Sequence, residues 1–269
     1  MLADDRRCQQ SLHRWGALNQ VLFDPSKESH HIVSRRDGDG STFRLLGVTF
    51  DSKLTMDVAV REVAHGATWR TAAVLRARRF LSVEDLVATF KGQVLGYIEC
   101  RTAAIYHASD SVLRPLDHVL DKFLAEIGLS DVDALLYLNL APLSARRDMA
   151  MLGLIHRAVV GQGPCQFNAF FEAAGDGHQR RTRAAGRLHA RQIRDPRGPT
   201  FSEQVRRSGH GLVAVCNLLP EEIVRASSVS EFQRSLQQLL KIAAAAERPF
   251  WRQLRWPRSP TRRRPLRGH

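Results

Sequence analysis

The residue types that most often perform catalysis do not fall into a catalytic pattern in this chain. The strongest candidates are His30, His31, His107, His156 and Ser41. None of them stands in the G-x-S-x-G context of a serine hydrolase or the H-E-x-x-H context of a zinc protease. The acidic segment 37–40 is too short for a calcium-binding loop. The sequence therefore predicts no independent active site and no small-molecule substrate.

Arginine is the residue type that stands out, and its guanidinium group is suited to binding phosphate. Lys and Arg total 40 against 27 Asp and Glu, so the formal net charge is +13. Segment 248–269 holds eight arginines and no acidic residue, and segment 178–207 holds nine arginines with only Asp195 and Glu203. The basic character therefore belongs to the C-terminal third. It favours an anionic partner, most often nucleic acid.

The size and composition are those of a protein with one or two domains. Of 269 residues, 43% are hydrophobic, which is enough to form a core. Neither a signal peptide nor an 18-residue apolar stretch is present, so we expect a soluble intracellular protein without a membrane partner, nuclear or cytoplasmic. No C-x-x-C pair occurs, which indicates neither a disulfide framework nor a zinc site. The four cysteines are Cys8, Cys100, Cys165 and Cys216.

Hydrophobic periodicity predicts a predominantly α-helical chain with a small antiparallel β element near the N-terminus, an α+β fold. Apolar residues recur at helical spacing in six segments, which are 4–18, 55–79, 83–106, 110–127, 144–160 and 229–246. We expect Ser144 to cap the fifth of these helices.

The β element is predicted around segment 43–51. Leu46, Val48 and Phe50 alternate with the residues between them, which is the pattern of a single strand. Gly47 would lie inside this strand, where glycine often marks a bulge or a close approach of another backbone. We also expect a short strand over 30–34.

This strand carries a resemblance to a known family. Its sequence, Leu-Leu-Gly-Val-Thr-Phe-Asp, resembles the FLGVxxD strand that closes the palm of reverse transcriptases from non-LTR (LINE or jockey-like) retrotransposons. Further motifs of that family follow in the same order. They resemble segments 12–29, 90–102, 116–124, 140–160 and 216–236, with Cys216 where the last motif has Trp. The resemblance implies the C-terminal part of such an enzyme: the palm end, the thumb and the helices that follow.

The resemblance assigns roles to two groups of residues near the N-terminus. The palm-closing strand is the family's primer grip, which holds the 3′ end of the growing strand. Its counterparts here are Leu46, Gly47, Val48 and Asp51. Lys27 occupies the place of the lysine of polymerase motif D, which is proposed to act as general acid toward the leaving pyrophosphate. The alternative for Lys27 is an ordinary solvated lysine in a turn.

The resemblance also implies contacts with an RNA/DNA template–primer. Segment 55–79 would be the first thumb helix, which tracks along the duplex, and Trp69 on its polar face would stack there or pack against the next helix. The candidate nucleic-acid-binding residues in this region are Trp69, Arg70, Arg76, Arg78 and Arg79. Those in the basic segments are Arg180, Arg181, Arg183, Arg262, Arg263 and Arg264.

Asp4 and Asp5 resemble the FADD motif, whose aspartates bind the two catalytic magnesium ions of the family. In the family those aspartates lie on a hairpin, and a return strand follows. Here they run directly into a helix, and no upstream segment supplies the third aspartate. We therefore expect no metal site and no cofactor in this fragment, with Mg²⁺ belonging to the complete family enzyme.

Together these observations predict five regions. They are a palm remnant (1–53), a thumb-like helical region (54–171), a basic linker (172–210), a C-terminal helical segment (211–247) and a disordered Arg/Pro-rich tail (248–269). We expect a truncated RNA-directed DNA polymerase that is inactive alone and retains template–primer binding at most. Two alternatives stay open: a non-catalytic basic nucleic-acid-binding module, and an inert relic of a decayed mobile element.

Overall fold

The computed structural model describes residues 2–34, 36, 38–174, 189–195, 203–248 and 251–252 of the chain. It confirms the expected fold class, because the described residues are mostly helical and contain one small antiparallel sheet near the N-terminus. Among these residues, no helix is both long enough and apolar enough to cross a membrane.

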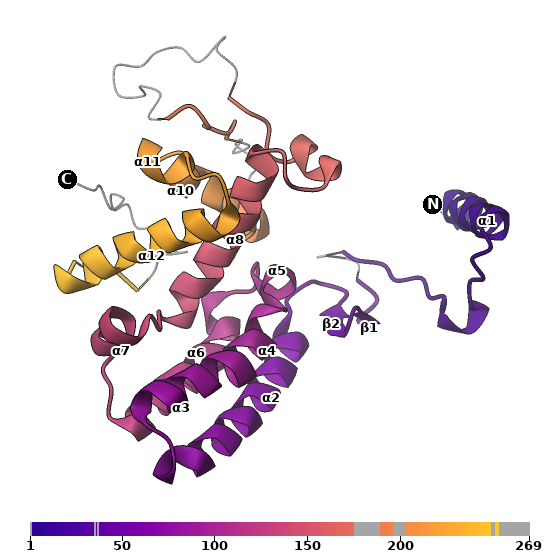
Figure 1. Ribbon diagram of the computed structural model, residues 1–269. Helices are drawn as coiled ribbons and strands as arrows, with labels where there is room; N and C mark the ends of the chain where they lie inside the picture. Colours follow the sequence, from indigo (N-terminus) through magenta and orange to yellow (C-terminus); the bar gives the residue numbers. More distant parts are fainter. Residues whose placement is uncertain are drawn as a thin grey trace.

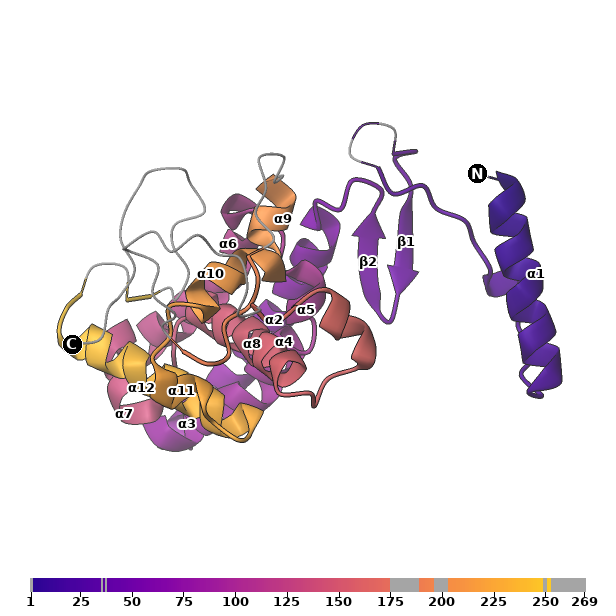
Figure 2. The same ribbon diagram turned by 90° about the horizontal axis from the view of Figure 1, so that it is seen from above.

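The N-terminal region consists of a helix and a β-hairpin. Helix α1 (Leu2–Leu18) is followed by a 3₁₀ turn (Pro25–Lys27) and by strands β1 (Thr42–Leu45) and β2 (Val48–Asp51). In both views α1 lies apart from the helical body, and the hairpin lies between them (Figures 1 and 2).

A first helical lobe, residues 57–127, follows the hairpin. Ser82 and Ser109 cap two of its helices by accepting hydrogen bonds from backbone N–H groups, and Gly128 ends the last one in a left-handed conformation. Phe90 and Phe123 stack in its core with ring centroids 3.9 Å apart. Its helices are α2 (Asp57–Arg76), a 3₁₀ turn (Ala77–Arg79), α3 (Val83–Phe90), a π-helix (Lys91–Leu95), α4 (Gly96–Glu99), α5 (Thr102–Ile105) and α6 (Asp110–Ile127).

A second lobe, formed by the described residues of 131–174 and 203–248, has its own hydrophobic core. Its centre is the packing of α8 against α12, with Leu152, Phe232 and Leu236 fully buried (Figure 1). Its helices are α7 (Asp131–Leu138), α8 (Leu143–Val159), a 3₁₀ helix (Cys165–Ala169), α9 (Glu203–Arg207), a 3₁₀ helix (Gly209–Leu212), α10 (Val213–Cys216), α11 (Glu221–Val224) and α12 (Val229–Ala245).

Two polar contacts, one buried and one partly buried, join the lobes. Arg147 in α8 donates to both carboxylate oxygens of Asp117 in α6, at 2.8 and 3.1 Å. Next to it, the Tyr106 hydroxyl donates to Asp148 over 2.6 Å. Because both pairs connect elements from different lobes, they fix how the lobes meet.

The prediction of one strand over 43–51 is wrong. The segment folds into a hairpin with Phe43 paired to Phe50 and Leu45 to Val48, and Leu46 and Gly47 form its turn. Both turn residues have positive φ, 49° and 79°, as the tightest hairpin turns require. Segment 30–34 forms no strand either, although the Ser34 N–H donates to the Ser52 carbonyl over 2.9 Å. The acidic segment 37–40 includes Asp37, which lies outside the described residues.

Three helix predictions also need correction. The continuous helix expected over 83–106 is interrupted by the π-helix and by a break after Glu99. Helix α7 was not expected. Ser144 does not cap α8: Pro142 occupies the N-cap position, and the Ser144 hydroxyl donates to the Arg252 carbonyl over 2.8 Å.

Parts of the two segments expected to be a linker and a tail pack against the second lobe. His189, Ile193 and Trp251 are all buried, and Ala173 forms an isolated antiparallel bridge with Ile193. Trp251 is therefore a core residue and is not free to stack on a base. The region boundaries themselves stay predictions.

Candidate nucleic-acid interface

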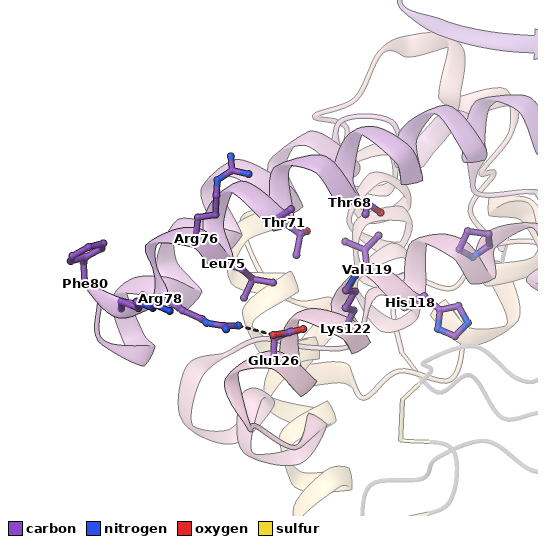
Figure 3. Close-up of a pocket in the computed structure, with 13 residues that line it drawn as sticks. Thr68, Thr71, Leu75, Arg76, Arg78, Phe80, His118, Val119, Lys122 and Glu126 are labelled. Atoms are coloured by element: carbon purple, nitrogen blue, oxygen red, sulfur yellow. Dashed lines mark hydrogen bonds and ion pairs between the residues drawn. The ribbon is translucent and has the colours of Figure 1, made fainter.

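A hollow in the first lobe lies between α2 and α6. Val60, Val63, Ala67 and Val74 form a buried stripe at helical spacing, which seats α2 against the core. The last turns of the two helices lie side by side, because Arg78, directly after α2, reaches across to Glu126 in the last turn of α6 (Figure 3).

This hollow is a groove of about 770 Å³ with an apolar floor and a basic rim, and we call it the α2–α6 groove. Leu75 and Val119 contribute to its floor, and Thr68 and Thr71 add hydroxyl groups (Figure 3). The basic side chains that line it are Arg76, Arg78, Arg79, His118 and Lys122.

The positive charge of the groove is only partly compensated. Arg78 donates to Glu126 over 2.7 Å, and His118 lies 3.6 Å from Asp121. Arg76, Arg79 and Lys122 are exposed and form no ion pair with any carboxylate in the described part of the chain. Three cations are therefore available to an anionic ligand at one site.

Two large aromatic side chains stand exposed beside these cations. Trp69 is 65% exposed and Phe80, which lines the groove, is 87% exposed. The alternative that Trp69 packs against the next helix is therefore wrong. Trp69 precedes Arg76 by seven residues, so both project from the same face of α2.

Arg70, the last of the candidate residues on segment 55–79, does not line this groove. Arg70 lies over the ring of Tyr97 in α4, with its guanidinium carbon 3.7 Å from the ring centroid. Of the five candidates on segment 55–79, three line the groove, Trp69 stands beside it, and Arg70 points to another side of α2. The candidates in the basic segments, Arg180, Arg181, Arg183, Arg262, Arg263 and Arg264, lie outside the described residues.

The four primer-grip-like residues do not form one surface. Leu46 is 96% exposed at the tip of the hairpin, next to Gly47, whereas Val48 is buried. Asp51 turns toward its own chain: its carboxylate accepts hydrogen bonds from the backbone N–H groups of Lys53, Thr55 and Met56, at 2.8 to 3.1 Å.

These bonds also set the protonation of Asp51. Burial disfavours its ionised form, but the hydrogen bonds from Thr55, Met56 and Lys53 outweigh burial and hold the pKa of Asp51 below its usual value. The carboxylate therefore joins the hairpin to the start of α2.

Lys27 lies in the 3₁₀ turn after α1. Its amino group is 3.5 Å from the Asp24 carboxylate, and the side chain is 82% exposed. The Ser26 hydroxyl and N–H both donate to Asp24 and lower its pKa. No other ionisable partner of Lys27 occurs among the described residues.

The sequence analysis missed Lys122 and His118, which complete the groove. They lie four residues apart on α6, hence on one face, and this spacing was the available signal. Asp4 and Asp5 fall in the first turn of α1, as expected, and their side chains are not described. No group of three or more His, Cys, Asp or Glu that could hold a metal ion occurs in the described ranges.

Comparison of the chain with protein-family models, with curated proteins and with solved structures gave no match.

Proposed function

We propose that this chain binds nucleic acid without catalysing a reaction, through the α2–α6 groove, as the template–primer-binding part of a non-LTR-type reverse transcriptase. The observation that carries the proposal is the set of three cations, Arg76, Arg79 and Lys122, which surround one groove and pair with no carboxylate of the residues that the structure describes. The reverse-transcriptase parentage rests on the order of sequence motifs alone.

The chemistry of the groove suits a nucleic-acid backbone. Each cation that approaches a phosphate releases condensed counterions, and this release drives sequence-independent binding. Arginine forks match the two free oxygens of a phosphodiester. The exposed rings of Trp69 and Phe80 offer faces on which unpaired bases at a primer end could stack. The groove therefore combines the two kinds of contact that single strands and duplex ends require.

The hairpin and the Lys27 turn support a binding role without chemistry. Asp51 uses both carboxylate oxygens within its own turn, and among the described residues the one ionisable partner of Lys27 is Asp24. The proposal therefore assigns no catalytic step to either residue.

Fluorescence anisotropy with a labelled RNA–DNA hybrid tests this role. The groove variant carries Arg76→Gln, Arg79→Gln and Lys122→Gln. The control variant, Arg157→Gln, Arg225→Gln and Arg234→Gln, removes the same charge from exposed positions of the second lobe. We expect the groove variant to bind at least about tenfold more weakly than the control at 0.1 M salt, since each phosphate contact contributes strongly there. Equal weakening in both variants would contradict the assignment of the groove.

Primer extension on an RNA template tests the non-catalytic part of the proposal. We expect no nucleotide incorporation by the wild-type chain. Incorporation that disappears in an Asp4→Ala, Asp5→Ala variant would overturn it. A chain that binds no nucleic acid at any salt concentration would instead favour an inert relic.

A further inference from the structure

A second basic site lies on the side of α2 that faces α4. Tyr97 of α4 lies across Gly66 of α2, where any larger side chain would collide with its hydroxyl group. The ring therefore rests directly on the backbone of α2. It forms a platform one turn away from Arg70.

Two guanidinium groups share this platform. The central guanidinium carbon of Arg70 lies 3.7 Å from the centroid of the Tyr97 ring, and that of Arg101 lies 4.3 Å from it. Each is also anchored to the backbone: Arg70 donates to the Gly66 carbonyl over 3.0 Å, and Arg101 donates to the Tyr97 carbonyl over 2.7 Å. The cation–π contacts and these bonds hold both groups in place before any ligand arrives.

Neither guanidinium is neutralised. Arg70 and Arg101 form no ion pair with any carboxylate among the residues that the structure describes. Arg101 makes one more contact, to the Cys100 sulfur at 3.1 Å. An arginine side chain has five N–H donors, so most donors of both groups remain for a ligand. Holding two like charges near one ring is unfavourable, and a bound anion would relieve that repulsion.

We infer that Arg70, Tyr97 and Arg101 form a clamp for a backbone phosphate of nucleic acid. Two fixed guanidinium forks match a tetrahedral oxyanion that accepts several hydrogen bonds at once. The inference rests on the proposed function and extends its contact surface. Arg70 directly follows Trp69, so it points about 100° around α2 from it. Trp69 therefore lies between the clamp, on one side of α2, and the α2–α6 groove, on the other side. A single nucleic-acid molecule that crosses α2 can contact both sites.

The first experiment removes the charges of the clamp. The variant Arg70→Gln, Arg101→Gln is compared with Arg157→Gln, Arg225→Gln, which has the same net charge, in titrations of a labelled RNA–DNA hybrid over a range of salt concentrations. We expect the slope of log affinity against log salt to become shallower by about one for the clamp variant, because the clamp holds one phosphate, and binding at 0.1 M salt to weaken at least about tenfold. No such change is expected for the control.

The second experiment leaves every charge in place. Tyr97→Leu removes the platform, whereas Tyr97→Phe keeps the ring. We expect Tyr97→Leu to weaken binding severalfold and Tyr97→Phe to bind like the wild type, because the cation–π contacts need the aromatic ring and not its hydroxyl group. Thermal unfolding of both variants establishes that they are folded.

The outcomes separate the inference from the proposed function. If the wild type does not bind the hybrid, the proposed function fails. If the wild type binds and the groove variant is weakened, but the clamp variant behaves like its control, only the clamp is overturned. Polyglutamate and an oligonucleotide of equal charge are also compared as competitors. If polyglutamate displaces the hybrid from the clamp as effectively as the oligonucleotide does, the assignment of phosphate as the ligand is overturned.

Discussion

At the scale of single residues, side chains that resembled a polymerase motif serve the local fold. Asp51 matches the aspartate of the primer-grip motif in sequence. Its carboxylate oxygens, however, accept hydrogen bonds from the backbone N–H groups of Lys53, Thr55 and Met56. Met56 needs this support, because it begins α2 in a left-handed conformation with φ 63°. The sequence could predict that an aspartate follows the strand. It could not show whether that carboxylate faces a ligand or its own chain.

The pH dependence of stability tests this role of Asp51. Asp51→Asn should lower the free energy of unfolding by about 1–2 kcal/mol at pH 7, the usual cost of losing charge-assisted bonds to a helix start. Because the pKa of Asp51 is lowered in the folded state, its stabilisation is present above about pH 4 and is lost as the pH falls through the native pKa. The difference between the two proteins should therefore shrink below pH 4 in urea unfolding. A difference that is the same at pH 7 and pH 3 would contradict this account.

At the scale of elements, the sequence predicted where helices begin and end better than how strands turn. The helix over 110–127 was predicted with its observed bounds, because Ser109 and Gly128 are strong capping signals. The hairpin turn was missed because its first residue is Leu46, and leucine rarely adopts positive φ. An Asn or Asp before Gly47 would have revealed it. Helix α7 did have a signal in Ser130 followed by Asp133. The Ser130 hydroxyl accepts a hydrogen bond from the Asp133 N–H and donates one to the Asp133 carboxylate.

Two glycines inside helices give opposite expectations. Gly92 in the π-helix has no neighbouring atom near the position of an added Cβ, so Gly92→Ala should raise the free energy of unfolding by about 0.5–1 kcal/mol. Gly153 in α8 faces Val229 and Gln233 of α12, where an added Cβ would lie only 3.2 Å from the Val229 methyl. Gly153→Ala should therefore lower it by about 1–3 kcal/mol. Urea unfolding measures both, and a stabilised Gly153→Ala variant would contradict the observed packing of α8 against α12.

At the scale of the whole molecule, two hydrophobic cores meet at a partly buried ion pair, in which Arg147 is buried and Asp117 is about one-third exposed. The Arg147 side chain is only 6% exposed, and Asp117 binds it through both oxygens. No sequence pattern links Asp117 to Arg147, because the two residues belong to different helices and the spacing of residues along one helix does not predict contacts with another. The same limit applies to the clamp, where Arg70 reaches the Tyr97 ring, which Arg101 also contacts, only after α2 and α4 have packed together.

Removing one partner of this pair should destabilise both lobes together. Asp117→Ala leaves the buried Arg147 guanidinium without its carboxylate, and because the Asp117 side chain is partly exposed, we expect a loss of about 1–3 kcal/mol in urea unfolding. The double variant Asp117→Leu, Arg147→Met removes both charges and should recover most of that loss. If the double variant were as unstable as Asp117→Ala, the pair would not be the contact that matters between the lobes.

The central claim is that the α2–α6 groove binds the nucleic-acid backbone, and one salt titration tests it most directly. The affinity of the wild type and of the Arg76→Gln, Arg79→Gln, Lys122→Gln variant for an RNA–DNA hybrid is measured from low to high salt. We expect a steep negative slope of log affinity against log salt for the wild type, and a slope shallower by about three for the variant, one for each lost phosphate contact. Identical slopes for the two proteins would show that the groove contacts no phosphate and would contradict the claim.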